Sequence, residues 1–175
     1  MPPRSPLSER LRVAHLSPTR PNPFDIAPDA AARARIAEDL DLTGLPELRF
    51  SGSVRASGAD DWALTGRLAA QVVQPCAITL EPVETTLAED VALIFSPHAS
   101  APEGEEVEMG DDSVEPLGQW IDIGEIALET LSLALPTHPL APGAEMPDEA
   151  QPDGEADEGT RKPFAGLADL MKGNG

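Results

Sequence analysis

Cys76 is the one cysteine among the 175 residues, and a thiol can act as a nucleophile when a nearby histidine accepts its proton. His98 and His138 are the candidate bases. His98 lies in an acidic stretch and His138 lies close to prolines, so neither is expected to be held with the precision that catalysis needs. We therefore favour the alternative that Cys76 is a small buried apolar group, and we expect no enzymatic activity.

A metal site is not expected either. A closed zinc site needs about four ligands, usually thiolates or imidazoles, and the chain offers one cysteine and three dispersed histidines. The sequence also contains no Gly-rich phosphate loop and no Gly-x-Ser-x-Gly motif. We expect no cofactor and no small-molecule substrate.

Asp122 and Glu125 could form a pair of acids for proton transfer. Their spacing is also that of a capping box, with Asp in place of the usual Ser or Thr, ahead of apolar residues at helical spacing. We favour the helix cap, since an acidic residue there satisfies free backbone N–H groups and matches the helix dipole.

Four arginines near the N-terminus are candidates for RNA contact, because they fall in the half of the chain where charges balance. They are Arg10, Arg12, Arg33 and Arg35. The alternative, which we prefer slightly, is a solvated surface with local ion pairs. No aromatic-rich strand signature of an RNA-recognition module accompanies them.

The charge of the chain is concentrated in one block. Residues 68–160 hold 21 of the 31 Asp and Glu residues and no Lys or Arg, and the net charge is −19. Such a block repels phosphates and anionic membranes and attracts cationic surfaces. Cationic proteins are therefore the expected partners of this block, and no membrane partner is expected.

Alternating apolar and polar residues predict four strands. They cover residues 8–17, 48–54, 62–74 and 84–95, with a hairpin turn at 57–60. The apolar run at 91–95 is expected to be buried on both faces. Prolines at positions 18, 21 and 23 are expected to break the chain after the first strand.

Two helices are predicted from apolar residues at helical spacing. The first covers residues 30–40, with Pro28 in its first turn. The second covers residues 123–135 and is stopped by Pro136, and Leu128 and Leu133 widen its apolar surface, so we expect it to be well buried.

Together these elements predict an α+β fold with a curved, mainly antiparallel sheet and two helices. Residues 1–140 are expected to form a single domain that carries an acidic loop at about 96–117. An acidic linker at 141–161 follows, and then a short amphipathic segment at 162–172 that we expect to dock on a partner. The N-terminus lacks the apolar run of a signal peptide, and a cytoplasmic location is expected.

Three short motifs give the chain a family resemblance. They are CAITLEPV at 76–83, an acidic helix start at 121–126 that leads to LPTHP at 135–139, and KPFAGL at 162–167. This order resembles the YceD-like family of bacterial and plastid proteins, which is linked to accumulation of 23S ribosomal RNA. Thr79 stands where many members have a second cysteine, and Lys162 where the tail often has Asn.

The resemblance implies a noncatalytic factor in the synthesis, processing or stability of 23S ribosomal RNA and in large-subunit assembly. With the acidic charge, it implies basic ribosomal or assembly proteins as partners, and direct contact with ribosomal RNA is left open. The alternative is an acidic adaptor or holdase for a cationic protein unrelated to ribosomes. The family-motif and candidate interaction residues are Cys76, Leu80, Glu81, Pro82, Asp122, Glu125, Pro163, Phe164 and Leu167.

Overall fold

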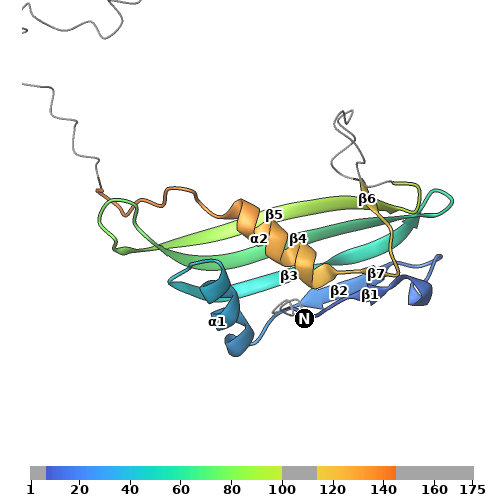
Figure 1. The fold of residues 1–175 in the computed structure, drawn as a ribbon, viewed down its shortest axis with the longest axis horizontal. Helices are drawn as coiled ribbons and strands as arrows, with labels where there is room; N and C mark the ends of the chain where they lie inside the picture. Colours follow the sequence, from blue (N-terminus) through green and yellow to red (C-terminus); the bar gives the residue numbers. More distant parts are fainter. Residues whose placement is uncertain (1–6, 100–113, 145–175) are drawn as a thin grey trace, which may run out of the picture. The chain divides into compact units, whose positions relative to one another are not determined.

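The structure is a computed structural model that describes residues 7–99 and 114–144, all of which belong to one compact unit. The main sheet has five strands in the order β2-β3-β4-β5-β6 (Figure 1). Their bounds are Asn22–Ile26, Gly44–Ser57, Asp61–Pro75, Pro82–Ser96 and Val114–Pro116. A two-stranded sheet pairs β1 (Leu11–Arg12) with β7 (Trp120–Ile121). The helices are α1 (Ala30–Asp39), α2 (Ile123–Ala134) and a 3₁₀ turn at Val13–His15.

All pairings are antiparallel except that of β5 with β6, which is parallel. The predicted α+β class with a mainly antiparallel sheet and two helices is therefore confirmed. The expected hairpin is present as β3 and β4, and a second turn joins β4 to β5.

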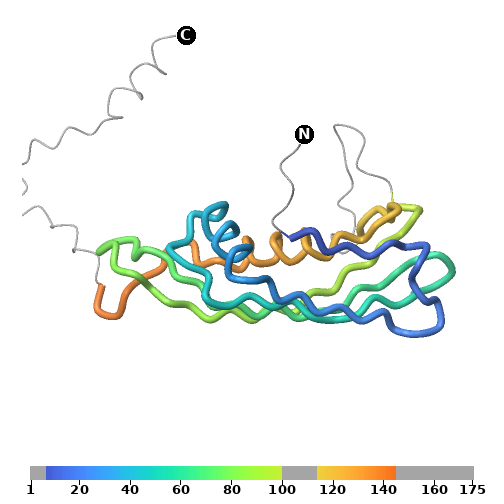
Figure 2. Tube along the Cα trace, turned by 90° about the horizontal axis from the view of Figure 1, so that it is seen from below, coloured from blue at the N-terminus to red at the C-terminus, as the bar shows by residue number. Residues whose placement is uncertain are grey.

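One face of the sheet carries the core. Figure 2 shows both helices and the N-terminal segment on the same side of the strands. Phe50 and Leu64 on the sheet and Ile36 and Leu131 on the helices are completely buried there. Gly52 allows the close approach of β4 at the centre, since a Cβ at this position would overlap the Thr65 carbonyl oxygen.

Both helices begin at an aspartate cap. Asp29 Oδ1 accepts a hydrogen bond from the Ala32 N–H at 2.8 Å, so α1 begins after Pro28 rather than containing it. Asp122 Oδ1 accepts from the Glu125 N–H at 3.2 Å at the start of α2. The expected helix at 123–135 ends one residue earlier, at Ala134.

The N-terminal strands differ from the prediction. The strand expected over 8–17 is limited to β1, after which the chain turns through Val13–His15. A strand, β2, occupies the segment that the prolines were expected to break. Pro23 lies within β2, which is possible because β2 is an edge strand and its other side needs no N–H donor.

Three further expectations are wrong. Ile94 is 36% exposed because the helices cover only one face of β5, so the run at 91–95 is not buried on both faces. Residues Val114–Pro116, expected within the acidic loop, form β6 beside β5. Leu133 is 85% exposed because it points away from the core, so α2 is buried on one side only. None of the described helices is long and apolar enough to cross a membrane.

Candidate functional site

The turn between β4 and β5, residues 76–81, contacts the loop that follows α2. The Ala77 N–H donates to the Pro139 carbonyl at 2.8 Å. The Gln74 side chain donates to the Pro136 carbonyl at 3.3 Å. Two of the motifs of the sequence, more than 50 residues apart, thus meet in space. We call this contact region, residues 74–82 with 135–141, the Cys76 junction.

Cys76 is the centre of the junction and is completely buried. Its sulfur accepts N–H groups from Ile78 at 3.5 Å, Thr79 at 3.4 Å and Ala141 at 3.3 Å. Its own N–H donates to the Glu81 carbonyl at 2.7 Å. The thiol is therefore a hydrogen-bond acceptor that ties the turn to the loop after α2.

These donors change the acidity of the thiol. The Thr79 side chain, followed by the backbone N–H groups of Thr79 and Ala141, lowers the pKa of Cys76 from 9.0 to about 6, although burial acts in the opposite direction. The surrounding N–H groups thus stabilise the thiolate form of Cys76. Its complete burial withholds it from any substrate, and within the described residues no hydrogen bond joins it to a histidine.

The surface of the junction is apolar at two points. Leu80 is 76% exposed and Leu140 is 52% exposed, and they belong to the two segments that meet. Leu80 also has a φ of 62°, in the left-handed region that leucine rarely adopts. The Leu80 N–H donates to the Cys76 carbonyl at 3.0 Å, which helps to hold this conformation.

Glu81 and Pro82, the remaining candidates of this motif, are exposed beside Leu80 and lead into β5. The Glu81 N–H donates to the Thr79 hydroxyl at 3.4 Å, so its backbone belongs to the turn. Asp122 acts as the N-cap of α2, as expected, and Glu125 supplies the N–H that it accepts. Pro163, Phe164 and Leu167 lie outside the described residues.

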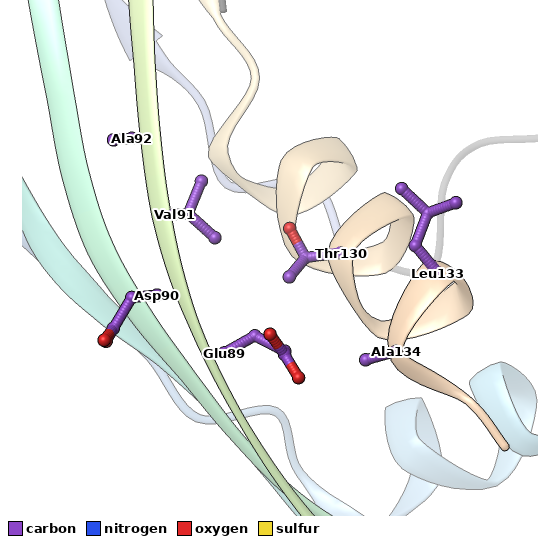
Figure 3. A pocket seen from close by; sticks show the side chains of 7 residues that line it. All are labelled: Glu89, Asp90, Val91, Ala92, Thr130, Leu133 and Ala134. Carbon is purple, nitrogen blue, oxygen red and sulfur yellow. The ribbon is translucent and has the colours of Figure 1, made fainter.

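Apart from the Cys76 junction, a groove lies between α2 and β5 and has a volume of about 390 Å³. Figure 3 shows Glu89 and Val91 pointing from β5 toward the helix, where Thr130 faces them. Leu133 stands out from the helix beside this groove. The groove has carboxylates and apolar side chains but no cation in its lining.

The four candidate arginines lie in different surroundings. The guanidinium carbons of Arg10 and Arg12 lie 5.6 and 5.8 Å from the ring centroid of Trp120. Arg33 instead donates to the Pro28 and Leu45 carbonyls at 2.8 and 3.1 Å, a bracing role for α1. Arg35 is exposed on α1. The structure therefore brings together only the first two, around an exposed tryptophan.

The Cys76 junction lies in a segment that matches a known family. A model of the family described as large ribosomal RNA subunit accumulation protein YceD matches residues 64–171. The chain belongs to the YceD family. Membership connects the protein with the ribosome, and the matched residues include both segments of the junction and Trp120. Comparison of this YceD-family chain with curated proteins gives no match, nor does comparison with solved structures.

Sequence reasoning missed Trp120 and Leu140. Trp120 has no local pattern that separates it from a core residue, and its exposure follows from the pairing of β7 with β1, which is far away in the sequence. Leu140 directly follows the LPTHP motif, and its proximity to a proline was the only available signal. Within the described part of the chain, no three His, Cys, Asp or Glu side chains are placed to hold a metal ion.

Proposed function

We propose that this YceD-family protein is a noncatalytic factor that supports the synthesis, processing or stability of 23S ribosomal RNA and large-subunit assembly. It acts by binding a basic ribosomal or assembly protein. The observation that carries the docking role is the pair of exposed leucines, Leu80 and Leu140, at the Cys76 junction.

Leu80 supports docking because it contributes little to folding. Its side chain is mostly exposed, and a left-handed conformation costs a residue with a Cβ about 1–2 kcal/mol. Strain of this kind at an exposed apolar residue is more common at functional sites than elsewhere. Burial of Leu80 by a partner, as an apolar anchor, would explain why an exposed leucine is held in this conformation.

The charges around the junction support a cationic partner. Glu81 and Glu84 are exposed at the start of β5, and no Lys or Arg occurs anywhere between residues 68 and 160. An apolar anchor beside uncompensated carboxylates fits a basic protein surface that carries an apolar pocket. Such a partner would be attracted over a distance by the acidic block and then held by the leucines.

The experiment has two arms. In the first, the protein is depleted from cells and ribosomal particles are separated on a sucrose gradient. We expect the ratio of 50S to 30S particles to fall and to recover when the wild-type protein is supplied. An unchanged ratio would contradict the ribosomal function and favour the alternative of an acidic adaptor for an unrelated cationic protein.

In the second arm, the depleted cells receive Leu80→Gly, which removes the side chain at a φ that glycine adopts freely. Loss of a buried leucine contact of about 1.5–3 kcal/mol weakens a complex by about 10- to 150-fold, so 50S recovery should be poor. Leu133→Ala, which shortens another exposed leucine, should restore 50S particles fully. Full recovery with Leu80→Gly would remove the junction as the docking site but leave the ribosomal function standing.

Salt separates the two contributions of the partner interface. Salt screens attraction between charges that are farther apart than about 8 Å at 0.15 M ionic strength, so the association rate of the co-purified partner should fall as salt rises. Leu80→Gly should instead raise the dissociation rate. An association rate that does not respond to salt would contradict the role of the acidic block.

A further inference from the structure

We propose that Trp120, Arg10 and Arg12 form a binding site for single-stranded RNA. A base stacks on the exposed part of the Trp120 ring, and the two guanidinium groups bind neighbouring phosphates. This inference goes beyond the proposed function, which acts through a protein partner and needs no RNA contact.

The site is built before any ligand arrives. Arg12 lies directly opposite Trp120 in the pairing of β1 with β7, and the Val13 N–H donates to the Gln119 carbonyl at 3.0 Å. The Gly124 N–H donates to the Glu9 carbonyl at 2.9 Å. The N-terminal arm is thus fastened to the segment that carries Trp120, and the backbone that carries the three side chains needs little ordering on binding.

Glycine at position 124 is required for this attachment. A Cβ there would lie 2.7 Å from the Leu7 carbonyl oxygen and 2.8 Å from the Leu7 Cβ. Leu7 is itself only 2% exposed, so the arm is anchored by a buried side chain just before the arginines. The basic side chains therefore project from a segment that the core holds in place.

The two arginines have charge available for a ligand. Arg49 and Arg67 are paired with carboxylates, at 2.6 Å from Asp25 and 3.1 Å from Asp90. Within residues 7–99 and 114–144, no carboxylate lies within 4.0 Å of either Arg10 or Arg12. The net charge of −19 repels phosphates in general, so a phosphate backbone can approach the protein where two cations lie together without a neighbouring carboxylate.

The exposed ring of Trp120 favours RNA over an acidic peptide as the ligand of this site. The residue remains 46% exposed although both guanidinium groups lie within about 6 Å of the ring, the range of a cation–π contact. Carboxylates would need only the arginines, whereas a base uses the face of an aromatic ring as well. The hollow beside the ring has a volume of about 480 Å³. Its lining includes Arg10, Arg12 and Trp120.

A single strand fits this arrangement better than a duplex. Bases in a duplex are stacked on each other, while those of a single strand can lie on an aromatic side chain. Two phosphate contacts and one stacked base make a small site. Binding should therefore be clearest at low ionic strength, with a short oligonucleotide.

The test uses the full-length protein with Trp62→Phe, which leaves Trp120 as the one tryptophan. A ten-nucleotide single-stranded RNA is added at 50 mM salt, and both tryptophan fluorescence and the anisotropy of labelled RNA are followed. We expect quenching of Trp120 at the same RNA concentrations that raise the anisotropy. Trp120→Ala should weaken binding at least about fivefold, and Trp120→Phe should retain most of it.

The arginines are tested by salt dependence. Each phosphate contact to a single strand contributes a slope of about −0.7 in a plot of log affinity against log salt. The double variant Arg10→Ala with Arg12→Ala should therefore reduce the slope by about 1.4. The matched control is Arg49→Ala with Arg67→Ala, which removes the same charge from two ion-paired residues and should leave the slope unchanged.

Three outcomes would overturn the proposal. The first is an equal loss of affinity in the control double variant, which would mean general electrostatics. The second is binding without quenching of Trp120. The third is equal binding of duplex RNA, or displacement of the RNA by polyglutamate at the same charge concentration, which would assign the surface to another ligand. These in vitro outcomes are independent of the 50S measurement.

Discussion

Leu131 and Leu133 lie on opposite sides of α2 and provide a matched test of how this helix is held. Leu131 is completely buried, and Leu133 is 85% exposed. Both are changed to alanine, so the same atoms are removed from the same helix in both variants. Alanine has a higher helix propensity than leucine, and this effect is shared by the two variants. Any difference between them measures packing against the sheet.

Truncation of a buried leucine costs about 2–5 kcal/mol, because transfer energy is lost and a cavity remains. For a chain of this length about 1 kcal/mol corresponds to about 3 °C in the melting temperature. We therefore expect Leu131→Ala to lower the melting temperature by about 6–15 °C. Leu133→Ala should change it by no more than about 2 °C, since exposed substitutions rarely exceed about 0.5 kcal/mol.

The assay is thermal unfolding followed by circular dichroism, with reversibility checked by cooling. If the two variants lower the melting temperature equally, α2 is not pressed on the sheet by the face that contains Leu131. A change of less than about 3 °C for Leu131→Ala would lead to the same conclusion. It would also weaken the argument that the loop after α2 is held at the Cys76 junction.

Two further predictions concern the junction and the helix cap. The pKa of Cys76 is lowered to about 6 in the folded state, from 9.0 for a free thiol. The folded state therefore holds fewer protons than the unfolded state between about pH 6 and 9. The resulting stabilisation is complete above the pKa of the unfolded state and is lost as the pH falls through 6. The difference in unfolding free energy between wild type and Cys76→Ser, measured with urea, should therefore grow from pH 6 to 9, and a constant difference would show that the thiol stays protonated. Asp122→Ala should cost about 0.5–2 kcal/mol by loss of the N-cap, while Asp122→Asn should cost much less because the amide oxygen still accepts the Glu125 N–H. Equal losses in the two Asp122 variants would assign the effect to charge instead.

Local patterns predicted the parts of the fold that form between near neighbours in sequence. The hairpin of β3 and β4 and the helix after Asp122 are set by alternation, turn residues and a cap, all of which act over a few residues. β2 was missed because Pro23 suggested a break, and only its place at the edge of the sheet makes that proline acceptable. The exposure of Ile94 was missed because a run of apolar residues does not reveal that one face of the sheet is left uncovered.

The candidate site was predicted only in its separate pieces. Cys76 was expected to be a buried group, but its contact with Ala141, 65 residues later, depends on the tertiary fold. Arg10 and Arg12 were named as candidates for RNA contact, whereas Trp120, whose ring lies next to both guanidinium groups, could not be found from local sequence. Pairing between distant short strands leaves no periodic signal, since each contributes only two residues.

The attachment of the N-terminal arm also has a consequence for the order of assembly. Leu11 pairs with Ile121, which the ribosome adds 110 residues later, whereas the β4–β5 hairpin joins near neighbours. During synthesis the arm must therefore wait until β7 has left the exit tunnel, long after the hairpins can fold. In hydrogen exchange, amides of the arm should exchange before those of β4, because two short strands open at a lower cost than the central sheet. The surface around Trp120 is thus completed late, and a chain in which β7 has not yet emerged or the arm has opened would lack it.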